Sequence, residues 1–311
     1  MKEALKEAAK NGDLKEVQTA LDVLNKDLAT IKGEALFLAV LNGNENIVDV
    51  LIQEGADINF KGGGNMDSCL KIAVMNGHLE IAKKLIGLGA DLNAKNKADY
   101  TALISAVRNN QFEAARVLMR FGADVNVQEQ LGFTPLMMTI EEEKKEIFDD
   151  LIYFGADVNL KNFMGQTPLM WAISCQKERP VRWLIDKKAD LERKNKRGDT
   201  ALMIAVRKGL VDIFKILLMS GSNLNAQNND GDTPLMEACF YKREELIKIL
   251  IQNGADVLIK NKRGEDAFNF AMKQGNLEMI KMIKEAAKKQ VSKRRIASQL
   301  IAQSVQRQNG I

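Results

Sequence analysis

The stretch GFTPLMMTIEEEKKEIFDDLIYFGADVN, residues 132–159, contains a pattern that recurs along most of this 311-residue chain. Its first leucine and the alanine of its closing Gly-Ala-Asp both return at intervals of 33 residues. The leucine series is Leu103, Leu136, Leu169, Leu202 and Leu235, with Leu70 before it and Phe268 after it. The alanine series is Ala90, Ala123, Ala156, Ala189 and Ala255, with Ser222 in the one remaining place. A fixed period of this length is typical of an array of stacked supersecondary units.

Two short helices are predicted within the quoted stretch. Thr134 suits the N-cap of the first helix, because its hydroxyl can accept a hydrogen bond from an amide of the first turn. Pro135 follows at the first helical position, where its missing N–H costs nothing. Helically spaced apolar residues then mark the buried side of each helix: Leu136 and Ile140, with Thr139 between them, and later Ile147, Phe148, Leu151 and Ile152. Gly155 is expected to end the second helix in the left-handed conformation.

The period of 33 residues and the Thr-Pro-Leu opening resemble the ankyrin repeat. The resemblance covers nearly the whole chain and gives about nine repeats, including degenerate repeats at both ends. It implies an all-α ankyrin-repeat solenoid of stacked helix-turn-helix units with short β-hairpin fingers. One such unit cannot bury both of its faces, so we expect the core to form between neighbouring units.

The repeats divide the chain into an array and a tail. Residues 1–284 are predicted to form the ankyrin array, with 1–31 as the N-terminal cap repeat and 265–284 as the C-terminal cap repeat. The second repeat is predicted from Glu34 to Asn59, and an inserted residue is expected within KGGGN, residues 61–65. Residues 285–311 contain no proline and no glycine before Gly310, and are predicted to form a basic C-terminal helix or tail.

Departures from the glycine of the pattern cluster in the middle of the chain. Glu143 and Gln176 replace the glycine between the two helices of their repeats, and Lys188 replaces the glycine of Gly-Ala-Asp. A side chain in the left-handed conformation costs about 1 kcal/mol. The sixth repeat, residues 166–192, is therefore expected to be locally weak unless Trp183 offsets the loss by packing.

Charge is distributed unevenly. The formal net charge is +4, yet residues 281–311 hold eight Lys and Arg against Glu285 alone. These residues thus carry +7, and the remaining residues carry −3. Only the C-terminal part of the chain could use charge to attract nucleic acid or an anionic membrane.

We expect a cytoplasmic, monomeric protein. The chain contains no apolar run long enough to span a membrane and no signal segment at its start. Cys69, Cys175 and Cys239 have no metal-binding spacing and are expected to be reduced thiols. Import into the nucleus through KKQVSKRR, residues 288–295, and secretion to a host by a dedicated machinery stay open alternatives.

No constellation in the sequence points to catalysis, to a cofactor or to a metal. The glycines of 61–65 lack the Lys-Ser/Thr and the preceding strand of a phosphate-binding loop. His78 is the only histidine, and the carboxylates of EEEKKE, residues 141–146, lie on a turn that we expect to be solvated. The methionines that recur with the period are expected to fill the core: Met137, Met170, Met203 and Met236. We therefore predict a protein that is not an enzyme and has no small-molecule substrate.

The remaining candidate for function is the surface. We number the residues of each first helix from its N-cap, which is position 0. Positions 2, 5 and 6 are then expected to face the core, and positions 4, 7 and 8 to face a concave groove. Exposed aromatic residues among charges are typical of protein-binding hot spots. The predicted partner-binding residues, which include neighbouring finger tips, are Met138, Phe163, Met164, Trp171, Ile204, Arg207, Phe240 and Tyr241.

The family resemblance implies a non-catalytic scaffold that binds a partner protein on this groove and acts as a regulator or effector. The alternative is that the basic tail binds nucleic acid or an anionic membrane. Residues 285–311 contain no aromatic residue to stack on bases, which argues against a specific nucleic-acid site. Removal of this tail is expected to leave the array folded.

Overall fold

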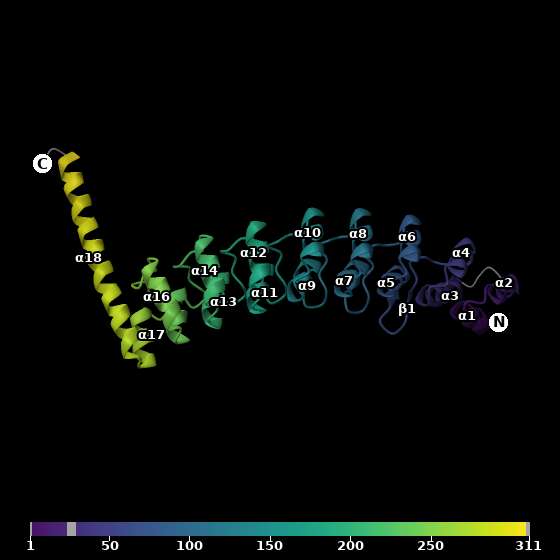
Figure 1. Cartoon of the computed structure of the whole chain (residues 1–311), viewed down its shortest axis with the longest axis horizontal. Coiled ribbons are helices and arrows are strands. Elements are labelled where there is room, and N and C mark those ends of the chain that lie inside the picture. The colour runs from purple at the N-terminus through teal and green to yellow at the C-terminus, as the bar shows by residue number, and fades with distance from the viewer. Residues whose placement is uncertain (1, 24–28, 309–311) are drawn as a thin grey trace. The chain divides into compact units, whose positions relative to one another are not determined.

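The computed structural model describes residues 2–23 and 29–308 (Figure 1). This part of the chain contains 18 helices and one two-stranded sheet, which confirms an all-α solenoid with few strands. The helices fall into two compact units, residues 1–163 and 164–311, and each unit is described by itself.

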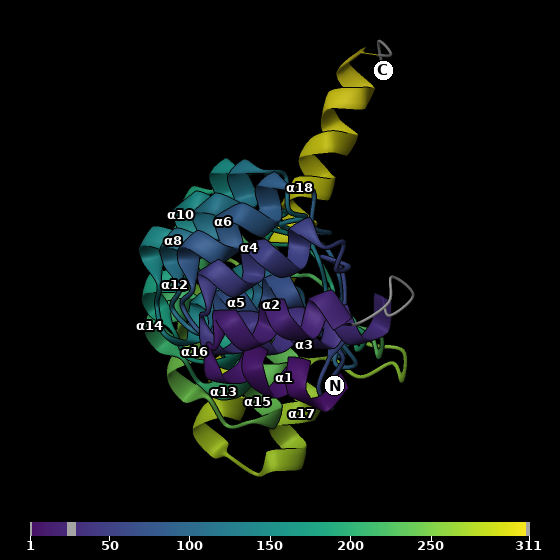
Figure 2. The same cartoon turned by 90° about the vertical axis from the view of Figure 1, so that its right-hand side faces the viewer.

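The first unit is built from pairs of short helices. Its first helices, α1, α3, α5, α7 and α9, pack side by side, and so do its second helices, α2, α4, α6, α8 and α10. Figure 2 shows α4, α6, α8 and α10 on one side of this unit. Their bounds are α1 Lys2–Asn11, α2 Leu14–Val23, α3 Ala29–Asn42, α4 Glu45–Gln53, α5 Cys69–Met75, α6 Leu79–Gly87, α7 Ala102–Arg108, α8 Phe112–Arg120, α9 Pro135–Glu141 and α10 Lys145–Tyr153.

The second unit continues the same plan with four pairs of helices. The first helices α11, α13, α15 and α17 lie side by side, and each packs against the second helix that follows it. Their bounds are α11 Pro168–Ser174, α12 Glu178–Asp186, α13 Ala201–Lys208, α14 Val211–Met219, α15 Pro234–Phe240, α16 Glu244–Gln252, α17 Ala267–Gln274 and α18 Leu277–Gln308.

Each first helix from α5 onward starts at the predicted cap. In all seven, an oxygen of the N-cap side chain accepts a hydrogen bond from the amide three residues later. The caps are Ser68, Thr101, Thr134, Thr167, Thr200, Thr233 and Asp266, which repeat the 33-residue period. The second repeat differs from the prediction. It was expected to start at Glu34, but its first helix, α3, already begins at Ala29.

The core lies between the helices of neighbouring repeats. Leu136 and Ile140 are buried in the first helix of their repeat, and Ile147, Phe148 and Leu151 are buried in the second. The four periodic methionines, Met137, Met170, Met203 and Met236, are at most 1% exposed. Their predicted role as core filling is therefore confirmed.

The fingers differ from the predicted hairpins. A β-hairpin forms in one of the described fingers, where β1 (Lys61–Gly62) pairs antiparallel with β2 (Asp67–Ser68). Gly62 lies so close to Phe37 that an added Cβ would approach the ring to 2.8 Å. Several other fingers are turns closed by one side chain, as at Asn228, whose Oδ1 accepts from the N–H groups of Asp230 and Asp232. A backbone hydrogen bond from the N–H of Asn228 to the carbonyl oxygen of Asp232, at 3.0 Å, completes this turn.

The chain ends in a single long helix. α18 comprises 32 residues and passes through Lys284 without a break, so the second helix of the last repeat and the basic tail form one element (Figure 1). Met279, Ile283 and Ala286 are buried on its inner side, whereas residues 291–296 are exposed all round. The contact with the array therefore extends beyond the predicted boundary at 284.

Candidate protein-binding surface

In the first unit, two predicted partner-binding residues lie at different depths. Met138 on α9 is half-buried. Phe163, in the finger that follows α10, is 55% exposed, and its backbone N–H donates to the carbonyl oxygen of Leu131 at 3.1 Å. Gly132 approaches this residue so closely that an added Cβ would come within 2.5 Å of the Phe163 backbone nitrogen. Adjacent fingers thus hold Phe163 in place with its ring accessible.

The other six predicted residues belong to the second unit. Met164 is 51% exposed and Trp171 is half-buried on α11. Ile204 is only 5% exposed, so it lies beneath the surface. The other residues at position 4 of the helical count include Ile72, Ser105 and Glu237, and these are buried as well. First helices lie side by side, and a side chain at this position is covered by the neighbouring repeat.

Arg207, at the end of α13, is held between two carboxylates. Its guanidinium donates to both oxygens of Asp199 at 2.9 Å and to both oxygens of Glu237 at 3.2 Å. Asn228 Nδ2 donates to Glu237 Oε1 at 3.2 Å and lies 3.5 Å from Asp199 Oδ1. The Asp199 side chain is completely buried, so this group joins successive repeats from within.

Burial and charge pull the pKa values of this group in different directions. Burial alone would raise the pKa of Asp199, but the hydrogen bonds and charge of Arg207 outweigh it, and the pKa is lowered. For Glu237 burial prevails over the same partner, and the pKa is raised. Burial would lower the pKa of Arg207, yet the two carboxylates raise it further above its ordinary value. Arg207 therefore carries a permanent charge that is already neutralised within the protein.

Three aromatic rings gather at the end of α15 and on α17. Phe240 meets Tyr241 and Phe270 edge to face, with ring centroids 4.9 and 6.5 Å apart. Phe240 is 53% exposed, while Phe270 is buried. The guanidinium carbons of Arg207 and Arg263 lie 5.9 Å from the ring centroids of Tyr241 and Phe270, respectively. We call Phe240, Tyr241 and Phe270 the aromatic cluster.

Two cavities open beside the aromatic cluster. The first, of about 190 Å³, is lined by the cluster together with Arg197, Asp230, Asp232, Glu237 and Arg263. The second, of about 290 Å³, is lined by Met164, Gln166, Ser174, Asn195, Lys196, Arg197, Ile204, Arg207 and Lys208. Arg197 borders both, so the cavities form one continuous surface on the second unit. They bring together Met164, Ile204 and Arg207 in one cavity and Phe240 and Tyr241 in the other, while Trp171 lines neither.

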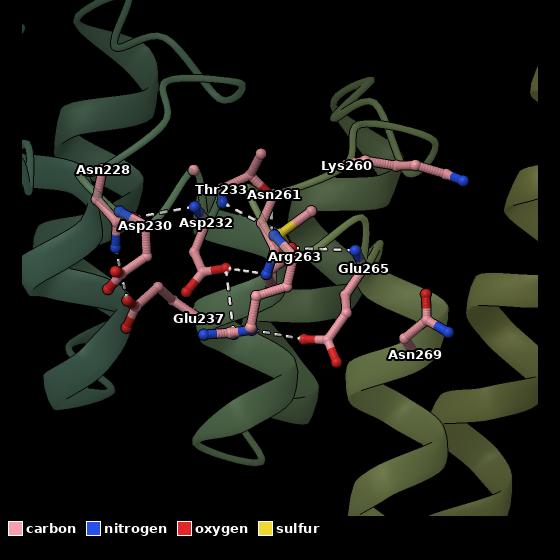
Figure 3. Close-up of polar contacts among 12 residues, drawn as sticks. Asn228, Asp230, Asp232, Thr233, Glu237, Lys260, Asn261, Arg263, Glu265 and Asn269 are labelled. Carbon is pink, nitrogen blue, oxygen red and sulfur yellow. Dashed lines mark hydrogen bonds and ion pairs between the residues drawn. The ribbon is translucent and has the colours of Figure 1, made fainter.

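The fingers beside these cavities are fixed by polar side chains (Figure 3). Asn261 Nδ2 donates to Asp232 Oδ1 at 2.6 Å, and Arg263 Nε donates to Glu265 Oε2 at 3.0 Å. The Asp232–Asn261 pair recurs at the same offset of 29 residues as Asp199–Asn228 and Asp67–Asn96. These residues were missed as contributors to the site. The paired Asp and Asn at a constant offset are the sequence signal that could have revealed them.

Two of the three cysteines are buried thiols with raised pKa values. Burial raises the pKa of Cys239 to about 12, and burial with the nearby charge of Asp57 raises that of Cys69 to about 12 as well. Both thiols therefore stay protonated, and neither can act as a thiolate nucleophile. In the part of the chain that the structure describes, no cluster of His, Cys, Asp and Glu is arranged to hold a metal ion. Among the same residues, no helix combines the length and the apolar character needed to cross a bilayer.

Family models of ankyrin repeats match this chain over residues 36–86, 70–162, 136–228 and 212–294. Among solved structures, the chain is similar to the ankyrin repeat domain of Bcl-3, which is described as a unique member of the IkappaB protein family. The TM-score is 0.65 at 26% identity, over 71% of this chain and 99% of that one. No curated protein matches the chain. Ankyrin repeats generally mediate protein–protein interactions and are in general non-enzymatic scaffolds. Since the matched segments together cover residues 36–294, the chain belongs to the ankyrin repeat family.

Proposed function

We propose that this chain is a non-catalytic scaffold that binds a partner protein and thereby acts as a regulator or effector. The binding surface is the face of the second unit formed by the two cavities and the aromatic cluster. The observation that supports this proposal is the exposure of Phe240 at the centre of three edge-to-face rings. Aromatic side chains in a partly desolvated setting supply much of the energy of protein interfaces.

The fixed geometry of this surface also supports binding. Arg207 is locked by four hydrogen bonds, and Asn228 and Asn261 fix the adjoining fingers. A surface that is already ordered loses little conformational entropy when a partner docks. In this arrangement Arg207 supports the surface from below, and Phe240 and Met164 make the exposed apolar contacts.

Affinity capture from native lysate tests the proposal. The full chain and its Phe240→Ala variant are compared with a control in which Lys215 and Lys248, on the second helices α14 and α16, are both replaced by alanine. We expect at least one protein that the wild type and the control retain and that Phe240→Ala loses. Loss of a hot-spot ring costs about 2 kcal/mol, or roughly thirtyfold in affinity. Identical sets of captured proteins for all three baits would remove this surface as the binding site.

A second candidate function rests on α18. Its cations Lys281, Lys284, Lys288, Lys289, Lys293, Arg294 and Arg295 are all exposed. Arg294 is paired with Asp256, and the rest form a basic helix that could attract polyanions. Binding of the chain truncated after Lys284 to an oligothymidine and to vesicles with anionic lipid tests this role. Full-length binding that weakens with salt and disappears on truncation is the expected result, and equal binding by both chains would exclude it.

A further inference from the structure

On the proposed surface most acidic side chains are buried, and most basic side chains are exposed. The side chains of Asp199, Glu237 and Asp232 are at most 13% exposed, whereas those of Arg197 and Arg263 are 66% and 57% exposed. Lys196, Lys208 and Lys262 are also exposed, and Asp230 is the exposed acid among the cavity-lining residues. A partner that approaches this face therefore meets cations first.

The buried acids are neutralised from within the unit. Asp199 and Glu237 share Arg207, and Asp232 accepts from Asn261. Arg197 reaches Asp199 at 3.7 Å and Arg263 reaches Glu265 at 3.0 Å, and the exposed Lys196, Lys208 and Lys262 add further positive charge to this face. Electrostatic complementarity mainly sets the specificity and the rate of association. The exposed positive charge of this face therefore favours a partner that carries negative charge.

The two cavities add apolar contact area, from the aromatic cluster in the first and from Met164 and Ile204 in the second. An apolar cavity of about 150 Å³ accommodates a molecule the size of benzene. The cavity beside Phe240 and Phe270 has about 190 Å³, and the one beside Met164 and Ile204 has about 290 Å³. Each therefore has room for one large side chain, which would contact the apolar residues of its lining. The cations Lys196, Arg197 and Lys208 lie at the second cavity, and Arg197 and Arg263 lie at the first.

We infer that the partner presents an acidic segment with at least two large apolar side chains. The apolar side chains enter the two cavities, and the carboxylates of the segment face Arg197, Lys208 and Arg263. A nucleic acid fits less well, because it offers no aliphatic side chain for the cavity beside Met164 and Ile204. This inference rests on the proposed function of the same surface and adds the chemistry of the ligand.

Selection of random peptides displayed on phage, with the full chain as target, tests the inference. The peptides recovered are synthesised with a fluorescent label, and their affinities are measured by anisotropy. Three variants are compared with the wild type: Phe240→Ala, a groove variant with Arg197, Lys208 and Arg263 replaced by alanine, and a matched control with Arg182, Lys215 and Lys248 replaced by alanine. The control removes the same charge from α12, α14 and α16. Circular dichroism confirms that each variant is folded.

Peptides that depend on Phe240 are expected to be net negative and to contain at least two large apolar residues. Their affinity should fall about tenfold in the groove variant, since three exposed charge pairs together contribute roughly that factor. The control should change it less than twofold, and added salt should weaken binding to the wild type more than to the groove variant.

Other results would overturn the inference in distinguishable ways. Phe240-dependent peptides that are neutral or basic, or that bind the groove variant unchanged, would leave the proposed function standing and remove the acidic ligand. If no recovered peptide depends on Phe240, both proposals fail. A labelled oligothymidine that binds the wild type more tightly than every peptide, and is released by the groove variant, would identify nucleic acid as the ligand of this surface.

Discussion

Arg207 and Asp199 form a two-pronged ion pair, with each Asp199 oxygen accepting from a different guanidinium nitrogen at 2.9 Å. Asp199 directly precedes the cap residue Thr200 at the start of α13, and Arg207 stands in its last turn, so the pair spans the length of one helix. Glu237 on the next first helix, α15, accepts from the same guanidinium. The pair therefore links helix α13 to its finger and to the following repeat.

Removal of the Arg207 guanidinium is expected to destabilise the protein. Arg207→Ala leaves the buried carboxylates of Asp199 and Glu237 without their cation, and the loss of one partner from a buried pair costs about 3–5 kcal/mol. We expect the free energy of unfolding, measured by chemical denaturation, to fall by at least about 3 kcal/mol. Lys208→Ala, one residue later and exposed, should change it by less than about 0.5 kcal/mol. Equal effects of both substitutions would show that the network contributes no stability.

The raised pKa of Glu237 should be visible in the pH dependence of the free energy of unfolding. Burial raises its pKa above the ordinary value of 4.5, so between 4.5 and the raised pKa the folded state binds more protons than the unfolded state. Stability contributed by this group therefore decreases as pH rises through that window. Asp199 has a lowered pKa and acts in the opposite sense, with stability that is present above its ordinary 3.8 and lost as pH falls through the lowered pKa.

Glu237→Gln separates the two contributions. The variant cannot titrate at this position, so its stability relative to wild type should increase as pH rises from 4.5 upward. Denaturation curves at a series of pH values measure this difference. A difference that is constant across the window, or that decreases with rising pH, would contradict the raised pKa of Glu237.

Local features of the fold could be predicted from the sequence, because the residues that cause them are neighbours in the chain. Thr134 caps its helix as expected, and Glu143, Gln176 and Lys188 adopt positive φ values of 53°, 58° and 63° where the pattern calls for glycine. Phe240 and Tyr241 were predicted from the helical count alone, and both line the first cavity, beside the aromatic cluster.

Features that depend on neighbouring repeats were less predictable. Ile204 is buried because adjacent first helices cover it, which a helical count within one repeat cannot show. Arg207 was predicted as a partner contact, but the structure places it between Asp199 and Glu237, which are 8 and 30 residues away in the chain. The continuation of α18 past Lys284 is compatible with the sequence, which has no glycine or proline there, but the period of 33 residues suggested an end.

The strained position Lys188 offers a stabilising substitution. Its φ is 63°, whereas Lys187 immediately before it has a φ of −85°. Lys188→Gly should raise the free energy of unfolding by about 0.5–1 kcal/mol, since glycine adopts this conformation without a Cβ clash. Lys187→Gly should lower it by a similar amount or more, because glycine there adds entropy to the unfolded chain. Two lysine-to-glycine changes one residue apart thus have opposite predicted signs, and equal signs in thermal or chemical denaturation would refute the strain argument.

The position at which the C-terminal helix can be cut depends on Gln290. Its side-chain nitrogen donates to the carbonyl of Ala255 at 2.8 Å, and its oxygen accepts from the N–H of Val257 at 3.1 Å, so it closes the last finger against α18. Ala286 is buried one turn before it. This arrangement differs from the expectation that everything after Lys284 is dispensable for folding.

Truncation on either side of Gln290 tests this role. A chain that ends at Lys284 loses both hydrogen bonds and the burial of Ala286, and its free energy of unfolding should fall by about 2–3 kcal/mol, at about 1 kcal/mol per hydrogen bond plus the lost apolar contact. A chain that ends at Arg295 keeps these contacts and should stay within about 0.5 kcal/mol of the full chain. Gln290→Ala in the full chain should reproduce most of the first loss, whereas Lys289→Ala, which changes an exposed side chain, should not. If both truncated chains unfold at the same denaturant concentration as the full chain, the array is complete at residue 284 and Gln290 contributes nothing to its stability.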